Sequence, residues 1–139
     1  MTVYTDYISL STQGNTDIKD LTSKVESVVK KSKVQNGMVL VFVPGSTASI
    51  TTIEYEPGLL QDFPALMERI APKNIEYEHH KRWHDGNGHS HVRASLMGPS
   101  LVVPVINGSL ALGTWQQIVF VDFDNRSRNR KIIVQVQGE

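Results

Sequence analysis

All five histidines of the 139-residue chain lie in one short segment, and they are His79, His80, His84, His89 and His91. Imidazole titrates near neutral pH and binds transition metals, so such a cluster could form an acid–base site, a metal site or an anion pocket. The alternative is that the cluster has no function and is a solvated polar loop whose histidines lie together by chance.

The residues around the cluster suggest how it folds. The run Asp85–Gly88 is rich in residues that tolerate positive φ, which predicts a reversal of the chain. The residues after it alternate in polarity, which predicts a strand over 89–96 with His89 and His91 on one face. We therefore expect imidazoles from the two sides of the reversal to meet, with His79 close to His91.

A metal-binding interpretation can be examined from residue types. A catalytic zinc ion needs three protein ligands and an open position, and His79, His89 and His91 could supply them if the turn folds them together. His80 and His84 are four residues apart and could pair instead if they lie on a helix. Magnesium prefers carboxylates, waters and substrate phosphate to imidazoles. Spacing alone leaves zinc, magnesium and a metal-free site open.

Further candidates lie outside the histidines. Arg128 and Arg130 could offer forked donors to a phosphate, or could be solvated charges that protect a sheet edge. Glu54 lies in what should be a buried part of a strand, where a carboxylate is commonly paired or functional. Trp115 could be a core ring or the wall of a ligand pocket, and Gln116 beside it a fixed amide.

Composition narrows the class of protein. Fourteen basic residues balance fourteen acidic ones, so no global field recruits nucleic acid or an anionic membrane. The chain has no cysteine, which excludes disulfides, thiolate metal ligands and cysteine nucleophiles. No window has the length of a membrane span and the first residues lack a signal-peptide pattern, so we expect a cytoplasmic protein.

Hydrophobic periodicity predicts an α+β fold. We expect a β-rich antiparallel sandwich with two helices in the first half, as a single domain over residues 1–139. One helix should run from residue 16 or 17 to Asn36-Gly37, and the other from 57 to 72 with an interruption near Pro64. The expected strands cover residues 3–10, 38–43, 46–56, 89–96, 101–106, 109–113, 115–123 and 132–137.

Several motifs spread over nearly the whole chain are specific when taken together. They are Ser46–Thr51 followed by Glu54 and Pro57, Tyr77-Glu78-His79, Asn87–His91 with Met97–Ser100, Gly113–Gln116, and Arg126–Arg130 leading into Val134–Gly138. In these motifs the sequence resembles the YjbQ-like family, whose members have long been regarded as uncharacterised and are sometimes labelled secondary thiamine-phosphate synthases. One departure is Gly45, where members of the family often have histidine.

The resemblance implies a sheet-rich sandwich that assembles as a homotrimer, with its recurrent polar residues near subunit contacts. It also implies weak thiamine-phosphate synthase activity on a small phosphorylated molecule. The positions that match the family's functional residues are Glu54, His79, Asn87, His89, His91, Trp115, Gln116, Arg128 and Arg130.

We therefore expect an enzyme that acts on a small phosphorylated metabolite. His79, His91 and Glu54 would be catalytic, and the substrate would contact Asn87, Trp115, Gln116, Arg128 and Arg130. One alternative is a metal-dependent hydrolase, in which three imidazoles hold zinc and the glutamate activates its water. The other is a non-catalytic, oligomeric metal- or ligand-binding module whose histidines form a subunit contact.

Overall fold

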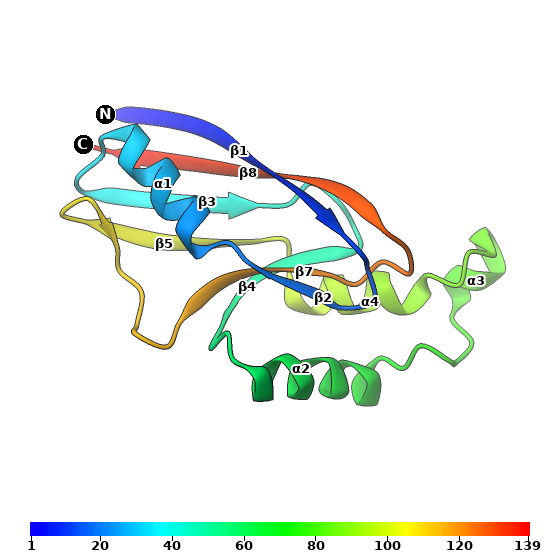
Figure 1. Ribbon diagram of the computed structural model, residues 1–139. Coiled ribbons are helices and arrows are strands. Elements are labelled where there is room, and N and C mark those ends of the chain that lie inside the picture. The colour runs from blue at the N-terminus through cyan, green and yellow to red at the C-terminus, as the bar shows by residue number, and fades with distance from the viewer.

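The computed structural model describes residues 1–139 and consists of two antiparallel sheets with four helices, so the predicted α+β fold is confirmed (Figure 1). The larger sheet has the strand order β1-β8-β3-β5-β6, and the smaller one β2-β7-β4. The strands are β1 (Thr2–Thr12), β2 (Asp17–Asp20), β3 (Gly37–Phe42), β4 (Ala48–Ile53), β5 (Ser100–Ile106), β6 (Ser109–Leu110), β7 (Gln117–Asp122) and β8 (Arg128–Gly138). The helices are α1 (Thr22–Ser32), α2 (Pro57–Ile70), α3 (Glu78–Trp83) and α4 (Gly88–Met97).

The large sheet is organised by its long inner strand β8, which pairs with β1 on one side and with β3 on the other. Ile132, Val134 and Val136 of β8 are fully buried, whereas the residues between them are half-buried. This period of two places one face of the strand on the core. Helix α1 adds Val25 and Val29 to the same core.

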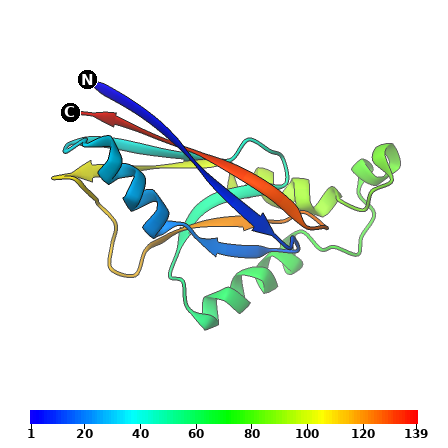
Figure 2. The same cartoon turned by 45° about the horizontal axis from the view of Figure 1, so that its top comes forward.

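A second, smaller core lies on the opposite face of the three-stranded sheet. Val119, Val121 and Phe123 from β7 and its end pack there against Met67 of α2 and Ala94 of α4. Both views show α2 along this face and α3 projecting from the body at one end of the molecule (Figure 1, Figure 2). No helix combines the length and the apolar character that a membrane crossing needs.

The two helices expected in the first half are present, with corrected bounds. The first was expected to begin at residue 16 or 17, but 17–20 form β2, and Ile18 pairs there with Val121 of β7. Helix α2 passes through Pro64 without interruption. It begins at Glu56, whose carboxylate accepts hydrogen bonds from the first free amides of the helix.

The strand expected over residues 89–96 is wrong, because these residues form α4. The apolar and small residues of this segment fit both the spacing of a strand and the spacing of a helix. Ser90, Ala94 and Met97 recur at helical spacing on the side of the sheet, which leaves Val92 and Leu96 exposed. The strand expected over 115–123 is shorter, since β7 begins only at residue 117.

Candidate functional site

The expected meeting of His79 and His91 is confirmed. Their ring centroids are 4.4 Å apart, with the planes inclined at 36°. His79 lies on α3 and His91 on α4, and both are half-buried. We call these two residues the histidine pair.

The Asp85–Gly88 reversal brings α3 back onto α4, although it joins two helices and not a helix to a strand. His84 ends α3 in the left-handed region with φ of 55°, and Gly86 follows with φ of 64°. The Asp85 carboxylate accepts a hydrogen bond from the Asn87 amide at 3.1 Å. The same oxygen lies 3.4 Å from His79 Nδ1, which makes no aligned hydrogen bond in the structure. The reversal therefore places a carboxylate beside the histidine pair.

The environment of His91 favours its neutral form. Burial lowers the pKa of His91 below its usual value of 6.5, and the neighbouring His79 lowers it further. The carboxylates of Asp85 and Asp124 act in the opposite direction without restoring it. Because two adjacent imidazolium rings repel each other, His91 in its neutral form is suited to accept a proton from a ligand.

Two buried carboxylates at the end of β7, Asp122 and Asp124, support this end of the molecule, and we call them the carboxylate pair. Asp122 accepts hydrogen bonds from Thr12 Oγ1 at 2.6 Å and from Arg130 Nε and Nη2 at 2.8 and 2.9 Å. This forked contact raises the pKa of Arg130. It joins β1, β7 and β8 at one point.

Asp124 reaches towards the histidine pair. Its carboxylate accepts hydrogen bonds from Thr47 Oγ1 at 2.9 Å and Asn87 Nδ2 at 3.3 Å, and pairs with Arg128 Nη2 at 3.1 Å. Burial alone would raise the pKa of Asp124, but the donors from Thr47, Arg128 and Asn87 together hold it below its usual value. Asp124 is therefore ionised and fixes three segments around it.

Asn87, expected to contact a substrate, is occupied within the chain. It is buried, it donates to Asp124, and its Oδ1 accepts a hydrogen bond from the Asn125 amide at 3.1 Å. These contacts fix the start of α4, which carries His91.

The two arginines expected to bind phosphate do lie at this end of the molecule. Part of their N–H donors are already bonded to carboxylates of the chain. Arg130 is committed to Asp122 through two nitrogens, and its side chain is mostly buried. Arg128 is 36% exposed and pairs with Asp124, while its Nε is buried without a partner.

His89 does not join the histidine pair. Two residues along a helix correspond to a rotation of about 200°, so His89 and His91 leave α4 on opposite sides. His89 is buried at 1% exposure, and its Nδ1 has no hydrogen-bond partner. Burial lowers its pKa to about 4, and the nearby cations Arg93 and Lys73 act in the same direction.

The three-histidine metal site expected from the sequence is not formed. No group of three or more His, Asp or Glu side chains is placed to hold a metal ion. His80 and His84 do not form a ligand pair either. His80 Nε2 accepts a hydrogen bond from the Gly88 amide at 3.2 Å, and His84 is exposed. The residues present therefore do not fit the expected three-histidine metal centre.

Three other predicted residues lie at the far end of the small sheet. In the register of β4 and β7, Ala48 pairs with Asp122 and Ile53 with Gln117. Glu54 follows Ile53, so about 15–20 Å of strand separates it from the carboxylate pair. Glu54 is exposed and was expected to be buried. Within one chain it does not reach the histidine pair.

Trp115 and Gln116 share that far end. Trp115 is 73% exposed and contributes to neither core, in contrast to the core ring that its sequence context allowed. The Gln116 amide is fixed, because Nε2 donates to Thr52 Oγ1 at 3.3 Å and Oε1 accepts from the Gly113 amide at 3.0 Å.

The sequence interpretation missed the carboxylate pair and Thr47. A signal existed in the pattern Asp122-Phe123-Asp124 followed by arginines at alternate positions. β7 and β8 lie in different sheets, and the short connection between them brings the arginines back onto the two carboxylates.

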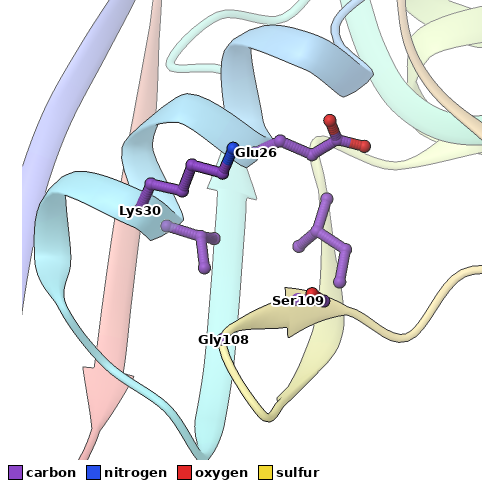
Figure 3. Close-up of a pocket in the computed structure, with 6 residues that line it drawn as sticks. Glu26, Lys30, Gly108 and Ser109 are labelled. Carbon is purple, nitrogen blue, oxygen red and sulfur yellow. The ribbon is translucent and has the colours of Figure 1, made fainter.

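A separate depression of about 290 Å³ lies between α1 and the β5–β6 turn, at the opposite end of the large sheet from the histidine pair. Figure 3 shows Glu26 and Lys30 on α1 beside Gly108 and Ser109 of the turn. Its charged groups are one glutamate and one lysine four residues apart on an exposed helix, an ordinary solvated arrangement. It offers no convergent polar groups comparable to those around Asp124.

Comparison with known proteins places the whole chain in one group. Residues 6–139 match the family model for UPF0047 protein YjbQ-like. A UPF0047 protein of Methanothermobacter thermautotrophicus is 42% identical over 139 residues, which cover 100% of this chain and 95% of the relative.

Two solved structures have the same fold. A YbjQ-like protein of unknown function from Sulfolobus solfataricus has a TM-score of 0.94 and 37% identity, with 99% of each chain covered. An uncharacterised conserved protein of the YjbQ/UPF0047 family from Clostridium acetobutylicum has a TM-score of 0.87 and 38% identity, with 95% of this chain and 99% of that chain covered. The chain therefore belongs to the YjbQ-like family, UPF0047.

Proposed function

We propose that this protein is an enzyme that acts on a small phosphorylated metabolite, and that thiamine-phosphate formation is its reaction. The observation that carries the proposal is the contact of 4.4 Å between the rings of the histidine pair. Two imidazole rings in contact beside a carboxylate are of little use to a fold, since an apolar contact would stabilise it more simply. They are of direct use to proton transfer and to charge stabilisation.

The reaction sets clear requirements. In thiamine-phosphate formation the thiazole nitrogen forms a bond to the methylene carbon of the pyrimidine, and the bond from that carbon to pyrophosphate breaks with its electrons moving to oxygen. No proton is consumed, but negative charge develops on the departing pyrophosphate. The ring N–H donors of the histidine pair and the exposed part of Arg128 are suited to stabilise that charge.

Turnover of the pyrimidine pyrophosphate with the thiazole phosphate tests this proposal. We expect the His79→Asn and His91→Asn variants each to lose about 100-fold or more in kcat, the scale of losing one positioned donor that stabilises developing charge. His84→Asn is the matched control, because His84 is exposed with positive φ and asparagine tolerates that conformation. Unchanged turnover in both variants of the pair would refute the catalytic role.

We also propose that the enzyme works as a homotrimer. The outer face of the large sheet supports association with further copies of the chain, because it presents a group of exposed apolar residues without a cover. Members of this group are Val3, Tyr7, Met38, Val102 and Ile106. Contiguous apolar surface of this kind marks interaction sites.

Sedimentation and light scattering test the assembly. We expect a trimer that Val102→Lys dissociates, because it places a charge on the apolar face. If a variant changed at both members of the histidine pair also dissociates, the pair is a subunit contact and the non-catalytic alternative is correct.

A further inference from the structure

The loop between β3 and β4, residues Pro44–Thr47, lies against the guanidinium of Arg130, and we call it the 44–47 loop. Thr47 Oγ1 accepts a hydrogen bond from Arg130 Nη2 at 2.8 Å and donates one to Asp124 at 2.9 Å. At the other end of the loop, a Cβ built on Gly45 would lie 3.2 Å from Arg130 Nη1. The 44–47 loop therefore lies close to the Arg130 guanidinium at Gly45 and at Thr47.

Several hydrogen-bond donors of the 44–47 loop and of Arg130 have no acceptor within the chain. Arg130 Nε and Nη2 are bonded to Asp122 and Thr47, but Nη1 makes no hydrogen bond. The backbone N–H groups of Gly45, Ser46 and Thr47 make none either, whereas Val43 before them donates to Pro99 at 2.9 Å. Gly45 and Ser46 are exposed, so a ligand from solvent can approach.

The charges around the loop favour an anion. Arg128 and Arg130 pair with two buried carboxylates, Asp124 and Asp122, and the exposed Arg126 beside them makes no ion pair of its own. Successive loop amides and a guanidinium fork together match the several acceptor oxygens of a tetrahedral oxyanion. A single carboxylate group would leave part of these donors without a partner.

We propose that the 44–47 loop and Arg130 Nη1 form a binding site for a phosphate dianion. Gly45 leaves room at this site, because a Cβ there would lie 3.2 Å from Nη1 and displace it slightly. The inference rests on the proposed function in one respect. The histidine pair, joined to this loop through Asp124 and Asn87, acts on the molecule whose phosphate group is held here.

Titration of the isotope-labelled protein with inorganic phosphate, pyrophosphate and a phosphate monoester tests the site by NMR. We expect the backbone amide signals of Gly45, Ser46 and Thr47 to shift on binding and to saturate, with the monoester and pyrophosphate binding as well as free phosphate or better. Inorganic phosphate that binds without the monoester would identify a site for the free ion and overturn the role in substrate binding.

The Gly45→Asp variant gives the sharper test, because it places a carboxylate beside Arg130 Nη1 as an internal competitor. We expect its affinity for each phosphate ligand to fall at least about tenfold, the effect of losing one charge-assisted hydrogen bond. The variant should fold, since Gly45 is exposed and lies outside the positive-φ region. Ser109→Asp is the matched control, because it adds the same charge on an exposed residue at the opposite end of the large sheet.

The outcomes separate this site from the proposed function. Equal affinities of Gly45→Asp and the unmodified protein, or signal shifts confined to other residues, would overturn the site. Turnover with an unchanged KM in Gly45→Asp would also overturn it while leaving the enzyme proposal intact. Saturable shifts at the loop in a protein without any turnover would confirm the site and refute the enzyme proposal.

Discussion

The two sides of α4 carry similar residue types and have different roles. On one side His89 is fully buried, and beside it Arg93 bonds to the Ala71 carbonyl at 3.0 Å and to Thr16 Oγ1 at 3.3 Å. On the other side His91 is half-buried, meets His79 and has no protein hydrogen bond to its ring. The first side ties the helix to α2 and to the start of β2, and the second is left available to a ligand.

The difference shows that a histidine in a cluster is assigned its role by burial and by its neighbours. His89 has lost its ability to ionise near neutral pH, since burial lowers its pKa to about 4. The pKa of His91 is lowered too, but its ring is accessible to a ligand and contacts the ring of His79. If this contrast is correct, changes on the first side act on stability and changes on the second act on chemistry.

The largest effect on stability is expected from Arg93→Met. The change leaves the Ala71 carbonyl and the Thr16 hydroxyl without their buried donor, which should lower the free energy of unfolding by about 4 kcal/mol. Denaturation by urea measures it. Arg69→Met, at an exposed position of α2, is the control and should be nearly neutral. A small effect of Arg93→Met would show that this side of α4 is not a structural anchor.

His89 should make the protein less stable in acid. Its folded pKa of about 4 lies below the unfolded value of 6.5, so the unfolded state binds a proton that the folded state does not between these pH values. Stability is therefore lost as the pH falls from 6.5 to about 4, by about 3 kcal/mol. In His89→Leu this loss should disappear, as thermal unfolding between pH 7 and pH 4 would reveal. Val92→Gln, an exposed change on the same helix, should keep the full loss.

His91→Asn should have a much smaller effect on stability. The side chain is half-buried and its ring accepts no hydrogen bond from the protein, so we expect a change below about 1 kcal/mol at pH 7. The same variant should lose turnover as described above. A large loss of stability without loss of turnover would make the two sides of α4 alike.

The smallest effect is a shift in the titration of His91. Because the neighbouring His79 contributes to its lowered pKa, His79→Asn should raise the pKa of His91 towards its usual value. Proton NMR of the ring signals follows this directly. Asp124→Asn should shift the pKa in the opposite direction, since Asp124 acts to raise it.

Much of the fold could be predicted from local pattern. The buried strand β3 was evident in its continuous apolar run, and the β5–β6 turn in Asn107-Gly108, where both residues have positive φ. The same holds for α1 and α2, although α1 is shorter at both ends than expected and α2 continues through Pro64. These elements share a strong periodicity that tertiary contacts do not override.

The errors arose where a segment of eight to ten residues fits both the spacing of a strand and the spacing of a helix. Residues 89–96 alternate in polarity, and only the small sheet beneath them selects the helix that separates His89 from His91. The contact between His79 and His91 was predictable from the glycine-rich reversal. The role of Asp124 was not, because its partners Thr47 and Asn87 come from two distant segments.

The position of β8 has a consequence for how the chain is made. This strand comes last along the chain, yet it lies between β1 and β3 and pairs along its length with β1. A nascent chain on the ribosome therefore holds its first strand without a partner until residues 128–138 have emerged. During that interval β1 and β3 expose unpaired edges, so synthesis should be the period in which this protein depends most on chaperones.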